Sequence, residues 1–246
     1  MTWQGKGRCD DMKAIVLCGG KGTRLRPYTY TIPKPMLPLG KKPILQYVLS
    51  SLKRAGVTDA YLAVGYLHEQ IEAHFGDGSK FGLRLHYSVE GSEMGTAGSI
   101  LPLGKKMDGT FVVMMGDHLS NLDIAAVIAA HKKSGNIATI ALNKKGVPLE
   151  YGVADLDASG NIARFREKPI VENYVNAGVY VFEPEIFKYI KPGEDFANNV
   201  FPRLLASGKK IGGYVFTDYW LDIGRTTDYE SINQYISVID LALGLK

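Results

Sequence analysis

The stretch LCGGKGTRLRPYTYTIPKPMLP, residues 17–38, follows a short apolar run and contains glycines, cations and prolines but no acidic residue. The preceding run KAIVLC, residues 13–18, has the length and apolar character of a buried strand. A glycine turn after the first buried strand of an α/β sheet lies at the carboxyl end of that strand, where such folds bind ligands. The stretch therefore predicts an anion site at one edge of an α/β sheet.

Two familiar phosphate-binding loops do not fit these glycines. The Walker pattern needs a glycine, four residues and then Gly-Lys-Ser/Thr, and GGKGTRLRP lacks this spacing. The dinucleotide pattern needs a third glycine, but the sixth position counted from Gly20 is Leu25. What fits is a turn whose free N–H groups close on phosphate oxygens, with Thr23 as a hydroxyl donor and Arg24 as a planar cation.

Prolines follow the glycine turn at positions 27, 33, 35 and 38. They predict an extended segment of about two dozen residues rather than a helix. Such a segment restricts Lys34 before any ligand arrives, which lowers the ordering cost of placing a flexible side chain. The simpler alternative is a surface loop with solvated cations.

The basic character of the chain is concentrated in one segment. No Asp or Glu occurs from Met12 to Thr58, and subtracting the nine cations of this segment from the overall charge of +4 leaves the rest of the chain at −5. These cations are Lys13, Lys21, Arg24, Arg26, Lys34, Lys41, Lys42, Lys53 and Arg54. A local anion site fits this distribution better than an RNA-binding surface, which also needs interleaved aromatic residues for stacking.

Length and composition indicate a globular protein. The 246 residues, 46% of them hydrophobic, are enough for one sizeable core, and the apolar runs fall far short of the roughly 18 residues of a membrane span. No signal-peptide pattern opens the chain. Cys9 and Cys18 are too few for a disulfide framework and lack metal-ligand spacing, so we expect a cytoplasmic protein with Cys18 in the core.

Short apolar runs alternate with amphipathic stretches up to about residue 145. This alternation predicts an α/β fold with a Rossmann-like, mixed but mainly parallel sheet and helices on both faces. The later stretch YGVADLDASGNIARFREKP, residues 151–169, predicts an antiparallel hairpin around a Ser-Gly-Asn turn. We expect one domain over 12–246, with a helical tail, and treat 1–11 as a disordered extension, a vector remnant or a misplaced start before Met12.

Six motifs occur in an order that resembles the sugar-1-phosphate nucleotidyltransferases. The glycine stretch is followed by GTAGS at 95–99, GD at 116–117, FREKP at 165–169, NAGVYVF at 176–182 and WLDIG at 220–224. The resemblance covers residues 12 to about 230. It implies an enzyme that joins a nucleoside triphosphate to a sugar 1-phosphate with the help of Mg²⁺, giving an NDP-sugar and pyrophosphate. The larger members of this family carry a C-terminal β-helix, which we do not expect here.

The resemblance also implies roles for individual residues. It assigns catalysis to Arg24, Lys34, Asp117 and Asp222, and Mg²⁺ chelation to Asp117 and Asp222. Lys168 would bind the sugar phosphate and Glu167 the sugar hydroxyls, with Gly152 and Asn176 also lining the sugar pocket. His118, beside a metal ligand, has no assigned role. The implied nucleotide-binding residues are Leu17, Gly19, Gly20, Gly22, Thr23, Arg24, Glu90, Gly95 and Thr96.

Substrate identity is less constrained than the reaction class. The motifs GTAGS and NAGVYVF look most like those of mannose-1-phosphate guanylyltransferases, and a carboxylate such as Glu90 suits guanine, whose N1–H and amino group both donate. Glucose-1-phosphate thymidylyl- or uridylyltransferase activity is the alternative. A non-catalytic nucleotide-sugar sensor is the alternative of another class, and a homo-oligomer is left open.

Overall fold

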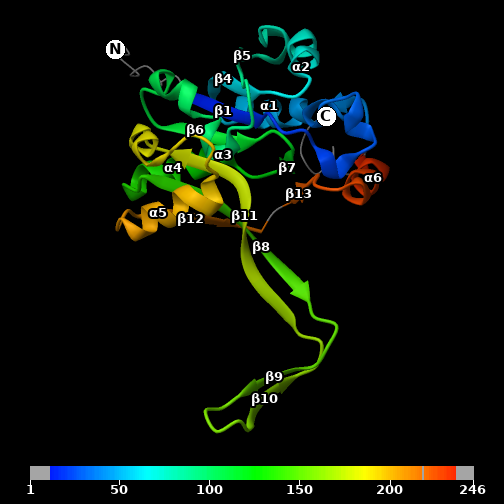
Figure 1. Cartoon of the computed structure of the whole chain (residues 1–246), viewed down its shortest axis with the longest axis vertical. Helices are drawn as coiled ribbons and strands as arrows, with labels where there is room; N and C mark the ends of the chain where they lie inside the picture. The colour runs from blue at the N-terminus through cyan, green and yellow to red at the C-terminus, as the bar shows by residue number, and fades with distance from the viewer. Residues whose placement is uncertain (1–11, 218, 237–246) are drawn as a thin grey trace, which may run out of the picture.

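A computed structural model describes residues 12–217 and 219–236. Its centre is a seven-stranded sheet in the order β12-β8-β11-β6-β1-β4-β5 (Figure 1). The strands are β1 (Met12–Cys18), β4 (Val57–Val64), β5 (Arg84–Val89), β6 (Phe111–Met115), β8 (Ala138–Pro148), β11 (Ile170–Phe182) and β12 (Ile211–Phe216). Strand β11 is antiparallel to both of its neighbours, whereas the other pairs are parallel. The mixed, mainly parallel sheet predicted from the sequence is therefore confirmed.

Side chains alternate between the two faces of the sheet along each strand, so both faces are apolar and both are covered by helices. On one face, the even-numbered side chains of β1 pack against α1 (Ile44–Arg54), α2 (His68–Phe75) and α4 (Ile124–Ser134). On the other face, the odd-numbered side chains of β1 pack in a cluster with α3 (Gly95–Gly98) and α5 (Phe201–Ala206). Each strand of the centre is thus buried on two sides, which explains its continuous apolar sequence.

The segment after the glycine turn is not extended, so this part of the sequence prediction is wrong. It forms three short 3₁₀ helices at Thr23–Leu25, Tyr28–Tyr30 and Lys34–Met36. The last two begin at prolines, because the fixed φ of proline is compatible with the first turn of a helix. The prolines still restrict the segment, but they do so by starting turns.

A third cluster of buried side chains packs the segment after the glycine turn against the C-terminal part of the described chain. Leu25 and Leu37 are buried beside Tyr229 and Ile232 of α6 (Thr226–Gln234). Two short ribbons border the same cluster: β2 (Pro38–Leu39) with β3 (Lys42–Pro43), and β7 (His118–Ser120) with β13 (Trp220–Asp222). Helix α6 confirms the predicted helical tail as far as it is described; the predictions for residues 1–11 and 237–246 fall outside the described residues.

Strands β8 and β11 continue beyond the sheet as a two-stranded arm (Figure 1). The arm ends in a second antiparallel ribbon, made of β9 (Val153–Leu156) and β10 (Ile162–Arg166). The predicted hairpin is confirmed, but the sequence did not indicate that it stands at the end of a long arm. Within the described residues, no helix has the length and apolar character needed to cross a membrane.

The aromatic cluster under one face of the sheet yields a test of the packing. Phe182 is fully buried, and its ring centroid lies 5.2 Å from Phe196 and 5.9 Å from Phe111. We expect Phe182→Ala to lower the free energy of unfolding by about 3–5 kcal/mol, because it removes a buried ring from a site that cannot fully collapse. Leu205→Ala, at a side chain that is 63% exposed, is the control and should change it by less than about 0.5 kcal/mol. Urea unfolding measures both.

Candidate active site

The glycine turn and Asp117 lie side by side because β1 and β6 are parallel neighbours in register. Leu17 pairs with Met115 across the two strands, and the Gly116 N–H donates to the Leu17 carbonyl at 3.0 Å. A Cβ on Gly116 would lie 2.6 Å from the Cys18 sulfur, so a larger residue would push the strand ends apart. The carboxyl ends of two neighbouring strands thus deliver the turn and the carboxylate to one place.

A cavity of about 410 Å³ opens at this edge of the sheet. The sequence analysis predicted most of the side chains and backbone groups that line it. The structure brings together there Leu17, Gly19, Gly20, Gly22, Thr23, Arg24, Lys34, Glu90, Gly95, Thr96 and Asp117. Residues from four separate segments therefore surround one cavity of a size that suits a nucleotide.

The glycine turn is held open by its own local contacts. Gly22 has a φ of +60°, and the Thr29 hydroxyl donates to its carbonyl at 2.8 Å. A Cβ on Gly22 would lie 3.0 Å from Thr29 and 3.3 Å from Lys34, so glycine allows both side chains to approach. Lys34 forms an ion pair with Asp117 Oδ2, and both side chains are mostly buried. A largely buried cation, Lys34, therefore lies beside the glycine turn in the lining of the cavity.

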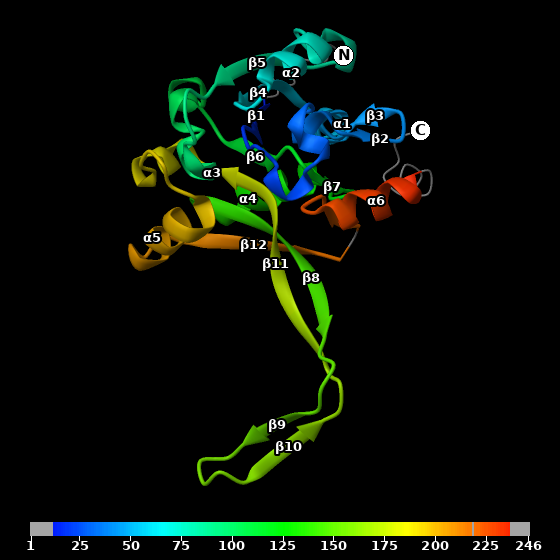
Figure 2. The ribbon, with the colours of Figure 1, turned by 45° about the vertical axis from the view of Figure 1, so that its right-hand side comes forward.

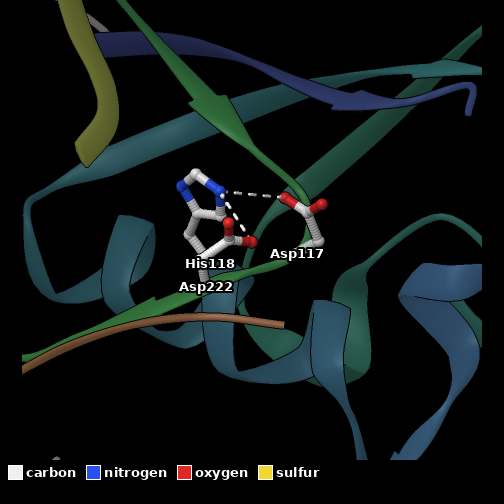
Figure 3. Close-up of side chains that lie close together, drawn as sticks. All are labelled: Asp117, His118 and Asp222. Atoms are coloured by element: carbon white, nitrogen blue, oxygen red, sulfur yellow. Dashed lines mark ion pairs between the residues drawn. The ribbon is translucent and has the colours of Figure 1, made fainter. Parts of the chain in front are cut away.

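Asp117, His118 and Asp222 converge beside the cavity (Figure 3). The His118 Nε2 atom lies 3.6 Å from Asp117 Oδ1 and 3.4 Å from Asp222 Oδ1. Its Nδ1 atom faces the Ala177 carbonyl at 2.9 Å and therefore donates there, because a carbonyl can only accept. The sequence left His118 without a role, and its position next to Asp117 in the GD motif was the one available signal.

Charge in this cluster is mutually stabilised. Burial alone would lower the pKa of the His118 ring, but the hydrogen bond to Asp222 and the charge of Asp117 outweigh it and raise the pKa. The same hydrogen bond from His118 lowers the pKa of Asp222 against the opposing effect of its partial burial. The charged forms of His118 and Asp222 therefore stabilise each other.

The cluster fits a divalent cation. Asp117 Oδ1 is buried and has no hydrogen-bond partner among the described residues, so it is an uncompensated acceptor. One ligand atom from each of Asp117, His118 and Asp222 can be chosen so that all three lie within 4.8 Å of one another. Carboxylate oxygens are the ligands that Mg²⁺ prefers, and imidazole adds a ligand that transition metals accept.

Glu90 also lines the cavity. A Cβ on Gly19 would lie 2.9 Å from Glu90 Oε2, so glycine makes room for this carboxylate. Burial raises the pKa of Glu90, partly offset by Ser99. Its Oε1 atom is buried without a hydrogen-bond partner in the described part of the chain. The carboxylate is thus positioned to accept hydrogen bonds from a ligand.

The loop that contains Gly95 and Thr96 is fastened to a turn far along the sequence. The backbone N–H and the hydroxyl of Thr96 both donate to Asp195 Oδ1, at 2.9 and 3.0 Å. The Ala97 N–H donates to the Glu194 carbonyl at 2.9 Å. Asp195 also lines the cavity, and no motif in the sequence indicated it. Its carboxylate thus fixes the position of Thr96 in the lining of the cavity.

Asp222 borders a second hollow of about 500 Å³ that adjoins the first. Arg24 lines both, and Lys145 lies over the Trp220 ring at 4.4 Å from its centroid. Arg225 adds a third cation to this hollow. The arrangement offers an anion-binding space next to the metal cluster.

The structure does not bring the predicted sugar-binding residues into either space. Gly152, Glu167 and Lys168 lie on the arm and are exposed. Asn176 lies where the arm leaves the sheet, and its side-chain amide donates to the Tyr180 hydroxyl at 2.9 Å. The physical reason is the outer part of the β8–β11 ladder, from the pair Leu142–Asn176 to the pair Pro148–Ile170, which carries the arm away from the cavity (Figure 2).

Fold and site together define an α/β protein with a cavity of nucleotide size beside an acidic cluster that could hold a metal ion. The chain belongs to the nucleotidyl transferase family, whose model matches residues 13–238.

Curated relatives in this family carry different substrate names. The chain is 40% identical over 240 residues to UTP–glucose-1-phosphate uridylyltransferase of Synechocystis, covering 89% of this chain and 61% of the relative. It is also 40% identical over 223 residues to mannose-1-phosphate guanylyltransferase of Mycobacterium tuberculosis, covering 88% and 62%. The chain thus spans about three-fifths of the length of these relatives.

Solved structures share the fold. A Bacillus anthracis protein named as a glucose-1-phosphate thymidylyltransferase, in complex with sucrose, matches with a TM-score of 0.75 at 25% identity, covering 96% of both chains. HddC of Yersinia pseudotuberculosis matches with a TM-score of 0.73 at 24% identity, covering 92% of this chain and 99% of that one.

The loop at Gly95 can be tested against a matched glycine in the same segment. Gly95 has a φ of +69°, and a Cβ there would lie 2.5 Å from the Glu194 carbonyl oxygen. We expect Gly95→Ala to lower the free energy of unfolding by at least about 1–2 kcal/mol and to weaken nucleotide binding. The reason is that the added methyl group forces the segment at Gly95 away from Glu194. Gly91, whose Cβ would meet nothing within 4 Å, is the control site for Gly91→Ala. Thermal unfolding and nucleotide titration measure the two effects, and equal behaviour of both variants would contradict the fastening.

Proposed function

We propose that the chain transfers a nucleotidyl group from a nucleoside triphosphate to a sugar 1-phosphate, forming an NDP-sugar and pyrophosphate. The observation that supports this most is the meeting of the glycine turn, the Lys34–Asp117 ion pair and the uncompensated Glu90 oxygen around one cavity. A binding protein has no need of a buried lysine next to a metal-binding carboxylate. The sensor hypothesis is therefore less well supported than the enzyme.

The reaction is an in-line displacement at phosphorus. An oxygen of the sugar 1-phosphate forms a bond to the α-phosphorus, and the bond from that phosphorus to the bridging oxygen breaks, so that pyrophosphate leaves with the electron pair. The amides of the glycine turn and Arg24 would hold the departing phosphates. Lys34 would lie against the α-phosphate, where negative charge grows in the transition state.

Mg²⁺ is the proposed cofactor, with Asp117 and Asp222 as its ligands. When bound, the ion would neutralise charge on the phosphate oxygens. Lys34, together with the ion held by the two carboxylates, would then offset the negative charge of the phosphates. Because Lys34 already pairs with Asp117, it balances the cluster before substrates arrive.

The choice of nucleotide is proposed from the residues expected to contact the base. Glu90, Gly95 and Thr96 would contact the base, and the Glu90 carboxylate favours guanine, which offers two adjacent donors. We therefore propose GTP and mannose 1-phosphate, with glucose-1-phosphate thymidylyl- or uridylyltransferase activity as the alternative. Two relatives of equal identity are named for different bases, so the choice of guanine rests on Glu90 and on the GTAGS and NAGVYVF motifs. We propose that the enzyme acts in the cytoplasm on small nucleotides and sugar phosphates, and not on nucleic acid or membranes.

Pyrophosphate release tests the reaction and the base together. We expect release with one nucleotide among GTP, UTP, dTTP, CTP and ATP, scored against mannose, glucose, N-acetylglucosamine and galactose 1-phosphates, and loss of release with a chelator. GTP with mannose 1-phosphate is the expected pair. Glu90→Gln keeps the shape of the side chain but presents one donor to the base edge, so it should lower the preference for GTP by about tenfold or more. Nucleotide binding without release from any pair would favour the sensor.

Two substitutions test the proposed catalytic groups. Lys34→Ala and Asp222→Asn should each lower turnover by about 100-fold or more while the protein stays folded, since each removes a charge that acts on the phosphates. Lys41→Ala is the matched control, because Lys41 is an exposed lysine of the same acid-free segment and should leave turnover unchanged. Steady-state kinetics and thermal unfolding separate loss of activity from loss of fold. Unchanged turnover would remove the residue from the mechanism.

A further inference from the structure

Two residues that line the cavity, Thr96 and Asp195, are joined although 99 positions separate them. The backbone N–H and the hydroxyl of Thr96 both donate to Asp195 Oδ1, and the Phe196 N–H donates back to the Thr96 hydroxyl oxygen at 3.1 Å. The proton and the oxygen of this hydroxyl therefore both have partners within the chain. Thr96 contributes to the site by where it is held, and not by a free hydroxyl.

The backbone of α3 adds to this contact. The Ala97 and Gly98 N–H groups donate to the Glu194 carbonyl at 2.9 and 3.0 Å. A Cβ on Gly98 would lie 2.9 Å from the Gly193 nitrogen, so glycine lets the two backbones approach closely. Five hydrogen bonds in all connect α3 with the turn that begins at Glu194.

The turn that holds α3 is itself anchored in the core. Phe196 is 1% exposed, and its ring centroid lies 5.2 Å from that of Phe182. Arg203 of α5 forms an ion pair with Glu194 and donates to the Tyr189 carbonyl at 2.6 Å. The turn is therefore a rigid support, because aromatic packing and a charged hydrogen bond both fix it.

The chain between β5 and α3 is held mainly at its two ends. At the β5 end, the Glu90 N–H donates to the Val64 carbonyl at 2.8 Å. Residues 91–93 are exposed and make no backbone hydrogen bond in the part of the chain that the structure describes. The ion pair of Glu93 with Lys21 joins two exposed side chains, and such pairs contribute little. The other end of this stretch is therefore positioned by the bonds of α3.

The position of Gly95 also affects Glu90, through Ser99. The Gly95 carbonyl accepts from the Ser99 hydroxyl at 2.6 Å, and Ser99 is 7% exposed. Burial raises the pKa of Glu90, and a hydrogen bond from Ser99 partly offsets this rise. The Ser99 hydroxyl has one proton for these two acceptors. A displaced Gly95 would release that proton to Glu90 and occupy a carboxylate oxygen that a base could otherwise use.

We propose that Asp195 is a positioning residue for the choice of nucleotide. Through Thr96 it sets the position of Gly95. Through Gly95 and Ser99 it keeps the Glu90 carboxylate available to the base. This inference rests on the proposed function, in which Glu90, Gly95 and Thr96 contact the base. A residue that only stabilised the fold would weaken all nucleotides alike, whereas a misplaced hydrogen-bonding group weakens the matching base most.

Nucleotide titration of two Asp195 variants tests this role. The probes are GTP, UTP, dTTP, CTP and ATP with Mg²⁺ and without any sugar phosphate. Asp195→Ala removes the acceptor for Thr96, so we expect the Kd of GTP to rise about tenfold and its preference over the next nucleotide to fall about tenfold. Asp195→Asn keeps an oxygen that accepts both Thr96 donors and should stay within about threefold of the wild type. An unchanged preference in Asp195→Ala, or equal behaviour of the two variants, would overturn the proposal.

Turnover adds a second readout. At saturating nucleotide, the kcat of Asp195→Ala should stay within about threefold of the wild type while the KM for GTP rises, because Asp195 acts on the base and not on the reacting phosphates. A kcat that falls as far as the KM rises would place Asp195 in the chemical step and overturn the positioning role.

A double variant shows whether Asp195 acts through Thr96. Thr96→Val keeps the shape of the side chain and removes the hydroxyl, so it should raise the Kd of GTP less than Asp195→Ala does, because the Thr96 N–H still donates. The double variant should match Asp195→Ala alone, since both substitutions break one contact. If the two effects multiply instead, Asp195 acts on the nucleotide independently of Thr96, and the proposal is overturned.

Asp123→Ala is the matched control for lost stability. The Asp123 side chain also accepts from a backbone N–H, that of Ala126 at 3.0 Å, and it caps α4 outside the lining of the cavity. Asp123→Ala should lower the Tm and leave the Kd of GTP and the base preference unchanged. A loss of preference as large as that of Asp195→Ala would show that stability explains both variants, and would overturn the proposal.

Binding and turnover separate this inference from the proposed function. If the wild-type chain binds one nucleotide preferentially but releases no pyrophosphate with any sugar phosphate, the proposed function fails and the Kd values still decide the role of Asp195. If it binds none of the five nucleotides, the role of Asp195 in nucleotide choice is overturned as well.

Discussion

The parallel pairing of β1 with β6 is the constraint on which the site depends. It sets the ends of the two strands next to each other, joined by the hydrogen bond from Gly116 to the Leu17 carbonyl. The glycine turn grows from one strand end and Asp117 from the other. Lys34, farther along the chain, forms an ion pair with Asp117, so that the groups proposed to bind phosphate and metal meet at one cavity. The other residues that line the cavity surround the ends of these two strands.

Strand β11 is the second organising element, since it serves both the metal cluster and the arm. The Ala177 carbonyl accepts from His118 Nδ1 at 2.9 Å and from Trp220 Nε1 at 3.0 Å. These two bonds fix the ring of His118 and, through it, the position of Asp222. The same strand continues outward as one side of the arm. Any movement of the arm's base is therefore coupled to the orientation of the cluster.

Much of the fold followed from local patterns. The strand at 13–18 and the alternation of strands and helices up to about residue 145 were predicted from apolar periodicity, because each element is buried on faces that the period of its own side chains defines. The extended segment expected after Pro27 was wrong, because a proline can begin a 3₁₀ turn as well as continue an extended chain. Periodicity does not distinguish these outcomes when the turns are only three residues long.

The family, the first strand, the glycine turn and most of the residues that line the cavity could be predicted from the sequence, because each lies in a short motif that is recognisable from neighbouring residues alone. The other features of the site became visible only in the folded chain. It joined Asp195 to the loop at Thr96, placed His118 between two carboxylates and carried Glu167 and Lys168 out on the arm. These outcomes depend on which distant segments pack together and on the direction in which a strand ladder continues, and neither is encoded in the spacing of residues along the chain.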